Sequence, residues 1–195
     1  MVEDIAQYNI FTTLDLKSAY HQIPICDKDR KYTAFEVCGK LYQFTRLPFG
    51  ITNGVSAFQR SIDSIIDKEN LSDIFIFVDN VTICGKTQEQ HDYNLQKFYE
   101  IARKYNITLN DSKSIISTSS ITLLGYTIQN NQISPDYDRL KPLLEMPPPL
   151  NLKSQRRIIG MFSYYSKFIQ NFSKKILLLN HNEKFPLPPS VLHSF

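Results

Sequence analysis

The spacing of apolar and polar residues along the chain predicts a series of short strands interspersed with helices. Runs rich in β-branched and aromatic residues are typical of strands. Such runs cover residues 10–16, 32–37, 41–44, 74–78, 81–84, 114–117 and 121–128. We expect the second and third runs to form a hairpin that turns at residues 38–40. The next two should join at Asp79 and Asn80, because these residue types tolerate tight turns.

Helical spacing appears in three other segments. Residues 52–66 repeat apolar side chains every three or four positions. Thr87 begins a capping-box sequence, which predicts a helix through about Tyr105. The inward-facing side chains of this helix should be Leu95, Phe98, Tyr99 and Ala102. Residues 153–169 carry a broad apolar stripe, which we interpret as facing a core. The stripe consists of Ile158, Met161, Phe162, Tyr165, Phe168 and Ile169. Strands and helices in this mixed order predict an α+β fold.

Prolines mark two breaks in the second half of the chain. The first is at Ser134 and Pro135, and the second is the run of three prolines at residues 147–149, where a helix cannot continue. We expect a boundary between lobes in this region. Pro142 falls inside a helix predicted from Asp136, and an interior proline costs ~3 kcal/mol. That helix should therefore be short or kinked.

Length and composition exclude several classes of protein. A chain of 195 residues can bury a core as one domain, or as a domain with a lobe. It contains no run of the roughly 20 apolar residues that cross a bilayer, and its acidic N-terminus lacks the apolar core of a signal peptide. The three cysteines include no C-x-x-C pair, which argues against structural zinc and favours a reducing compartment. We expect an intracellular protein that is not secreted and has no membrane partner.

The net charge of +3 is small, but its distribution is uneven. The segment 151–175 contains no acidic residue and carries +6, which leaves −3 for the rest of the chain. The basic residues of this segment are Lys153, Arg156, Arg157, Lys167, Lys174 and Lys175. A basic arm on a mildly acidic body favours nucleic-acid binding. The alternative is an ordinary solvated helix face.

Two aspartates are the strongest candidates for chemistry. Asp15 and Asp79 each stand at the end of an apolar, strand-like run, where a carboxylate is costly unless it meets a cation or a donor. If the fold brings them together, their repulsion calls for a divalent metal, and hard oxygen ligands suit Mg²⁺. Two such ions on rigid aspartates can activate a hydroxyl and stabilise a transferring phosphate. Each aspartate also has a structural alternative: Asp15 could cap a helix at Lys17, and Asp79 could simply form a turn.

The neighbourhoods of these aspartates resemble the motifs of a reverse transcriptase, most closely the polymerase of Gypsy-type LTR retrotransposons. The resemblance extends to about Ile176. The matching segments, in the family's order, are 11–23, 33–35, 42–51, 57–60, Lys113 after Leu109 and Asn110, 123–126, and 164–173. Each motif is short, but the ordered series is hard to explain by chance.

The resemblance implies a role for each matching residue. Asp15 and Asp79 would be catalytic and would hold two Mg²⁺ ions, or Mn²⁺, with the backbone carbonyl of Leu16. The nucleotide-binding set would comprise Lys17, Ser18, Ala19, Tyr20, Phe49, Gly50 and Lys113. The primer grip would comprise Leu124, Gly125 and Tyr126. A ring at Tyr20 would leave no room for a 2′-hydroxyl and so select deoxynucleotides. Outside this motif, Tyr20 would be read as a core tyrosine and Lys113 as a surface lysine.

The basic arm would then follow the nucleic-acid backbone. If residues 153–169 form one helix, Arg156, Gly160, Ser163 and Lys167 share a face away from the apolar stripe. Arg156, Gly160 and Lys167 are therefore expected to contact the backbone of a primer–template duplex, through contacts that carry no sequence information.

The resemblance also implies an architecture and a set of partners. The fold would be a palm, a mixed sheet with helices on one side, with partial fingers and a small helical thumb. Residues 1–134 would form the palm with partial fingers, lacking the N-terminal fingers segment. Residues 135–176 would form the thumb, and 177–195 the start of a truncated ribonuclease H-like region. Expected partners are an RNA or DNA template with its primer, deoxynucleoside triphosphates and the rest of a Pol polyprotein, including fingers, ribonuclease H and integrase.

One residue departs from the family pattern. The second catalytic motif of the family ends in two aspartates, whereas this chain has Asp79 followed by Asn80. An amide oxygen can accept a hydrogen bond or bind a metal but carries no charge. The site thus offers two carboxylates instead of three. We expect an RNA-directed DNA polymerase fragment with weakened activity; the alternative is a nucleic-acid-binding remnant without catalysis.

Overall fold

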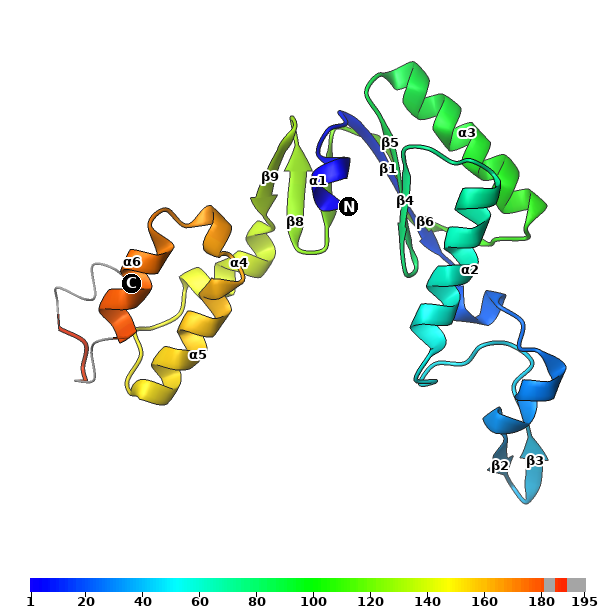
Figure 1. Ribbon diagram of the computed structural model, residues 1–195, viewed down its shortest axis with the longest axis horizontal. Helices are drawn as coiled ribbons and strands as arrows, with labels where there is room; N and C mark the ends of the chain where they lie inside the picture. Colours follow the sequence, from blue (N-terminus) through cyan, green and yellow to red (C-terminus); the bar gives the residue numbers. More distant parts are fainter. Residues whose placement is uncertain (181–184, 189–195) are drawn as a thin grey trace. The chain divides into compact units, whose positions relative to one another are not determined.

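The computed structural model describes residues 1–180 and 185–188 and divides the chain into two compact units (Figure 1). The first unit comprises Met1–Ile121 with Ile128–Gln132, and the second comprises Thr122–Thr127 with the described residues from Ile133 onward. Of the predicted ribonuclease H-like segment, residues 181–184 and 189–195 lie outside the described residues.

A four-stranded antiparallel sheet forms the centre of the first unit, with the strand order β4-β5-β1-β6. The strands are β1 (Ile10–Leu16), β4 (Ile74–Phe77), β5 (Asn80–Gly85) and β6 (Leu109–Thr118). The register between β1 and β6 shifts twice, on either side of Thr13. Because β1 is an inner strand, whatever stands at its end is flanked by β5 and β6.

Helices α2 (Gly54–Lys68) and α3 (Gln88–Lys104) lie on the same side of this sheet (Figure 1). Alternate residues of β1, β4 and β5 point toward them, and the resulting core is the main source of stability in this unit. Its buried sheet residues are Leu14, Leu16, Ile74, Ile76, Val81 and Ile83. The helices contribute Phe58, Ile62, Phe98, Ile101 and Ala102.

The first unit also contains shorter elements. They are α1 (Val2–Ile5), the 3₁₀ helices η1 (Ala19–Gln22) and η2 (Asp27–Thr33), and a hairpin of β2 (Phe35–Val37) and β3 (Lys40–Tyr42). A separate three-stranded sheet has the order β7-β8-β9, and its residues are divided between the two units. Its strands are β7 (Ser120–Leu123), β8 (Tyr126–Gln129) and β9 (Gln132–Pro135).

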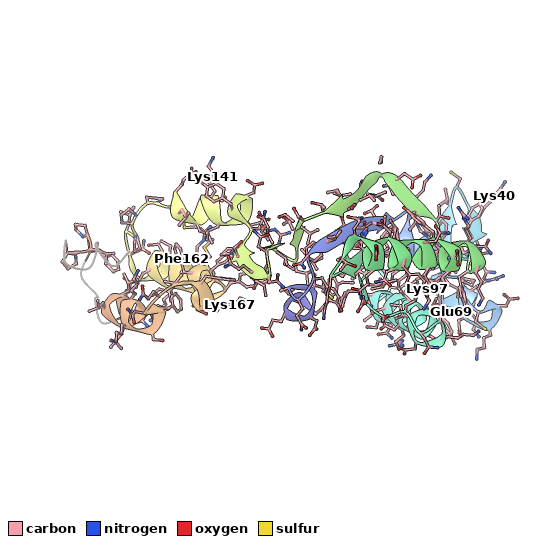
Figure 2. All side chains as sticks on the ribbon, turned by 90° about the horizontal axis from the view of Figure 1, so that it is seen from above. Lys40, Glu69, Lys97, Lys141, Phe162 and Lys167 are labelled. Atoms are coloured by element: carbon pink, nitrogen blue, oxygen red, sulfur yellow. The ribbon has the colours of Figure 1, made fainter. Side chains whose placement is uncertain are left out.

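The described part of the second unit is mainly helical. It contains α4 (Tyr137–Leu144), α5 (Leu152–Ser163), η3 (Ser166–Phe168) and α6 (Phe172–Asn180). The predicted apolar stripe faces inward here. Five of its six residues line an apolar cavity of about 370 Å³, namely Ile158, Phe162, Tyr165, Phe168 and Ile169. Phe162 is labelled in Figure 2.

The α+β class and most predicted elements are confirmed, and the capping residue Thr87 does accept a hydrogen bond from Gln90 N–H, at 3.2 Å. The reciprocal bond of the capping box differs. The Gln90 side chain accepts from the backbone N–H of Lys86, one residue before the expected donor Thr87. Pro142 does lie inside a helix, α4, which is only eight residues long.

Four predictions of element boundaries were wrong. Tyr32 belongs to the 3₁₀ helix η2 rather than to a strand. Residues 121–128 are interrupted by a turn at Leu124 and Gly125, where both backbones have positive φ. The β4–β5 turn consists of Val78 and Asp79, so Asn80 already belongs to β5.

The fourth error concerns the basic helix. The helix predicted over residues 153–169 ends at Ser163, and Lys167 belongs to the separate helix η3. Apolar spacing continues through the segment, but it does not reveal where the backbone leaves the α-helical conformation.

The β4–β5 turn is strained and is braced from α2. Val78 has φ of 55°, a conformation that is unfavourable for a β-branched residue and costs on the order of 1–3 kcal/mol. The side-chain amide of Gln59 compensates by bonding the backbone on both sides. Its Oε1 accepts from Val78 N–H and its Nε2 donates to the Ile76 carbonyl, each at 2.9 Å.

No helix among residues 1–180 and 185–188 is long and apolar enough to cross a membrane.

Replacing Gln59 with alanine should lower the free energy of unfolding by about 1–3 kcal/mol, because two backbone groups of a partly buried turn lose their partner. Urea denaturation measures the change. Gln96→Ala is the matched control, because the Gln96 side chain bonds the exposed side chain of Glu100, four residues along the same helix α3, and not the backbone of a turn among the described residues. Equal stability of the two variants would show that Gln59 does not brace the turn.

Cys84 should resist alkylation in the folded protein. Burial, and then the nearby charge of Asp73, raise the pKa of its thiol to about 12, so the reactive thiolate is suppressed at neutral pH. Cys26 and Cys38 are exposed. Mass spectrometry after iodoacetamide treatment should find two modified cysteines in the native protein and three after unfolding. Rapid native labelling of Cys84 would contradict its burial.

Candidate active site

Asp15 stands near the end of the inner strand β1, flanked by an asparagine on each neighbouring strand. Its register partners are Asn80 on β5 and Asn110 on β6. Asn110 Nδ2 donates to Asp15 Oδ2 at 3.1 Å, and Lys113 Nζ lies 3.9 Å from the same oxygen. The Asp15 side chain is 19% exposed, so it is shielded but still reachable from solvent.

Asp79 is brought beside Asp15 by the register of β1 and β5. Its backbone carbonyl accepts a hydrogen bond from Leu16 N–H at 2.8 Å, which ties the β4–β5 turn to the end of β1. Its Oδ1 accepts from Asn80 Nδ2 at 3.3 Å. The turn, the strand end and the asparagine side chain together restrict where the Asp79 carboxylate can lie.

The two aspartates line a single pocket of about 310 Å³ in the first unit. Most of the residues that the sequence assigned to metal and nucleotide binding lie around it. The lining residues are Asp15, Leu16, Lys17, Ser18, Ala19, Tyr20, Phe49, Asp79, Asn110 and Lys113. Of the residues predicted to be catalytic, metal-binding or nucleotide-binding, Asn80 and Gly50 are not part of the lining. An added Cβ at Gly50 would meet open space, but its φ of +87° itself disfavours a side chain.

The segment after β1 is fixed against Thr108, the residue that precedes β6. Lys17 N–H donates to the Thr108 carbonyl at 3.0 Å. The side-chain amide of Gln22 donates to the carbonyls of Lys17 and Thr108 and accepts from Thr108 N–H, at 2.7 to 2.9 Å. This network shapes the pocket wall that carries Ser18, whose φ is 50°.

Tyr20 is held between two phenylalanines at the wall of the pocket. Its ring lies 5.2 Å from the Phe49 ring, edge to face, and 5.4 Å from that of the buried Phe58 on α2. Phe49 also contacts His21 and is itself 69% exposed. Tyr20 is therefore anchored on one side by the core and bounded on the other by a ring open to solvent.

The donor set suits a hard divalent cation, although it is sparse. Among the described residues, no protein group donates a hydrogen bond to Asp15 Oδ1 or Asp79 Oδ2. Each carboxylate therefore keeps one oxygen for a ligand. The lining contributes two negative charges and the cations of Lys17 and Lys113. Residues 1–180 and 185–188 contain no cluster of three or more His, Cys, Asp or Glu that could hold a metal. The asparagines at 80 and 110 add amide groups without charge.

The predicted primer-grip residues and the basic residues belong to the second unit. Leu124, Gly125 and Tyr126 form the β7–β8 turn and the start of β8. Arg156 and Gly160 are exposed on α5. Lys167 instead lies over the Tyr126 ring, with Nζ 4.3 Å from its centroid. The expected row of Arg156, Gly160 and Lys167 along one helix is therefore wrong, because the α-helix ends before Lys167.

Sequence reasoning did not assign roles to Asn110, Gln59 or Gln22. Gln22 and Gln59 fall inside segments already recognised as motifs, but which backbone groups they bond depends on strands distant in the sequence. Asn110 precedes Lys113 on β6, and only the β1–β6 register shows that it meets Asp15. Strand pairing, rather than residue type, was the missing information.

Comparison with solved structures shows the same fold in foamy viral protease–reverse transcriptase. The structure of foamy viral protease–reverse transcriptase dRH in complex with double-stranded DNA aligns with a TM-score of 0.80 at 23% identity. The alignment covers 96% of this chain and 34% of the viral chain.

Sequence comparison identifies relatives among retrotransposon polyproteins of Drosophila melanogaster. The retrovirus-related Pol polyprotein from transposon opus is 36% identical over 165 residues, which is 84% of this chain and 16% of the polyprotein. The corresponding protein from transposon gypsy is 31% identical over 173 residues, 89% of this chain and 17% of its own length. This chain thus spans about a sixth of these relatives. The family model for reverse transcriptase (RNA-dependent DNA polymerase) matches residues 1–128, and the chain therefore belongs to the reverse transcriptase family.

Proposed function

We propose that this chain carries out template-directed DNA synthesis, adding deoxynucleotides to a primer 3′-hydroxyl along an RNA or DNA template. One observation carries the proposal: Asp15 and Asp79 line the same pocket as Tyr20, Phe49 and Lys113. Paired carboxylates, an aromatic wall and a cation in one pocket suit a nucleoside triphosphate and the metal ions that accompany it.

In this proposal the metal ligands are the carboxylates of Asp15 and Asp79 and the carbonyl of Leu16. They would hold two Mg²⁺ ions, or Mn²⁺, which when bound would activate the primer hydroxyl and neutralise phosphate charge. Asp15 offers Oδ1, because Asn110 fixes Oδ2. Asp79 offers Oδ2, because Asn80 bonds Oδ1.

The other lining residues bind and select the nucleotide. Lys113 is 68% exposed and can extend from Asp15 toward the charge that develops on the leaving phosphates. Tyr20 is braced by Phe58 and Phe49, so its ring cannot easily yield to a 2′-hydroxyl. Lys17, Ser18 and Ala19 contribute the pocket wall beside it, and Gly50 follows Phe49 in a conformation suited to glycine.

A second candidate function is nucleic-acid binding without catalysis. Asn80 favours it, because the amide donates to Asp79 where the family has a third carboxylate. With Asn110 and Lys113 contacting Asp15, the two carboxylates are already partly compensated by protein groups. The pocket could persist in this form without a metal.

The partners that we propose follow from the family. The foamy viral relative was solved with double-stranded DNA, and we propose an RNA or DNA template with its primer as the ligand of this chain. Leu124, Gly125 and Tyr126 would contact the primer. Deoxynucleoside triphosphates are the proposed substrates, and an intracellular Pol polyprotein is the proposed context.

A primer-extension assay with Mg²⁺ or Mn²⁺ tests the enzymatic proposal directly. Asp79→Asn should reduce incorporation by roughly a factor of 100 or more, because losing a metal-binding carboxylate removes several kcal/mol of transition-state stabilisation. Asp67→Asn, the same change at an exposed position on α2, should leave the rate unchanged. No incorporation by the unaltered chain, with duplex binding retained, would favour the binding function instead.

Asn80→Asp should tighten Mn²⁺ binding by about tenfold or more, since an added carboxylate raises the ligand charge of the site. Electron paramagnetic resonance of free Mn²⁺ measures this without reference to catalysis. Asn106→Asp adds the same charge at an exposed position after α3 and is the matched control. If both variants bind Mn²⁺ equally, residue 80 does not contribute to a metal site.

A further inference from the structure

The turn between β7 and β8 is held by two hydrogen bonds from helical parts of the second unit. Asp136, the N-cap of α4, donates its backbone N–H to the Gly125 carbonyl at 3.0 Å. The Tyr164 hydroxyl donates to the Leu124 carbonyl at 3.3 Å. Leu124 has a φ of 52°, which is strained for a residue with a side chain, so the turn needs such support, whereas Gly125 adopts its φ of 84° without strain. Its shape therefore depends on residues beyond the hairpin itself.

Tyrosine rings and a lysine cover one side of this turn. The rings of Tyr126 and Tyr164 are stacked, with centroids 5.9 Å apart and planes 14° from parallel. Lys167 Nζ lies 4.3 Å from the Tyr126 centroid and 5.0 Å from that of Phe168. A lysine over a tyrosine face gains roughly 0.5–1 kcal/mol at an exposed site. This contact favours a position of its ammonium beside the turn.

Arg139 of α4 approaches the same turn at Gly125. A Cβ at Gly125 would lie 3.2 Å from Arg139 Nη1 and 3.4 Å from its Cδ, so the guanidinium packs directly over the glycine. Arg139 Nε is 3.7 Å from Asp136 Oδ2, and its side chain remains 66% exposed. The guanidinium is thus oriented by one carboxylate while most of its donors face solvent.

Both cations act on the tyrosine that fixes the turn. A hydrogen bond with Tyr126, and then burial, raise the pKa of Tyr164, while the charges of Arg139 and Lys167 oppose that rise. Two positive charges are therefore within electrostatic reach of one hydroxyl. Tyr164 itself is 55% exposed. The surface combines two cations with a stacked pair of tyrosines, a composition that suits a nucleic-acid backbone.

We propose that Arg139 and Lys167 form a phosphodiester-binding pair around the 124–126 turn, with Tyr164 as the residue that positions the turn between them. This inference rests on the proposed function and moves the backbone contact from the α5 row to this turn. The planar guanidinium of Arg139 offers N–H donors that suit phosphate oxygens, and the ammonium of Lys167 adds a compact positive charge.

Fluorescence anisotropy with a short labelled RNA/DNA hybrid, over a range of salt concentrations, tests the pair. Arg139→Gln and Lys167→Gln should each weaken binding roughly three- to tenfold and reduce the slope of log affinity against log salt by about 1, as expected for one lost phosphate contact. Tyr164→Phe removes the hydroxyl and keeps every charge. It should weaken binding by roughly threefold with an unchanged salt slope, because a hydrogen bond to the turn is lost.

Lys141→Gln is the matched control for the loss of charge. Lys141 lies on α4, as Arg139 does, but in Figure 2 it projects on the other side of this unit from Lys167. Lys141→Gln should retain the affinity and the salt slope of the unaltered chain. If Arg139→Gln and Lys167→Gln bind the hybrid as tightly as Lys141→Gln does, with the same salt slope, Arg139 and Lys167 do not form a phosphodiester-binding pair. If the unaltered chain binds no hybrid even at low salt, the proposed function fails and the pair fails with it. Thermal unfolding of each variant separates lost contacts from lost fold.

Discussion

The antiparallel register between β1 and β5 is the constraint on which the candidate site depends. It sets Asp15 opposite Asn80 and lets Leu16 N–H bond the Asp79 carbonyl at 2.8 Å. Since side chains alternate along a strand, a shift of one residue would turn Asp15 toward α2 and α3 and bury its charge. The apolar residues Leu14 and Leu16 on the helix-facing side resist that shift. The hydrophobic core thereby fixes the position of a carboxylate that contributes nothing to the core itself.

Neutral amides neighbour both carboxylates of the pocket, and the amide at residue 80 stands where the family has an aspartate. Asn80 and Asn110 donate to Asp79 and Asp15, and Lys113 approaches Asp15. This arrangement relieves repulsion between the carboxylates without a metal, and it leaves one oxygen of each aspartate for a ligand. Substitution by an amide lowers the charge of the site but preserves its hydrogen-bonding capacity. The same geometry is consistent with weakened catalysis and with a binding role, and the two proposals differ in what the residue at position 80 contributes.

Strained backbone occurs at the turns that precede Asp79 and Tyr126, and groups from distant elements support it. Val78 precedes Asp79 with positive φ and is braced by Gln59 from α2. Leu124 and Gly125 are braced by Tyr164 and by the backbone of Asp136. The supporting groups come from α2 and from the residues that cap α4 and α5, and apolar packing sets the positions of these helices. The backbone conformation of each turn therefore depends on packing elsewhere in the same unit.

The sequence by itself determined the α+β class and the approximate positions of most elements, and it singled out Asp15 and Asp79 as candidate site residues. Those inferences rest on local signals: apolar periodicity, the Thr87 cap and short motifs that resemble one family. Only the tertiary structure decided that Asn110 meets Asp15, that Gln59 holds the β4–β5 turn, and that Lys167 leaves α5 to lie over Tyr126. Each of these contacts joins residues from different elements, and their geometry depends on strand register and on where a helix ends. Local periodicity carries little information about either, because both are settled by packing across the whole unit.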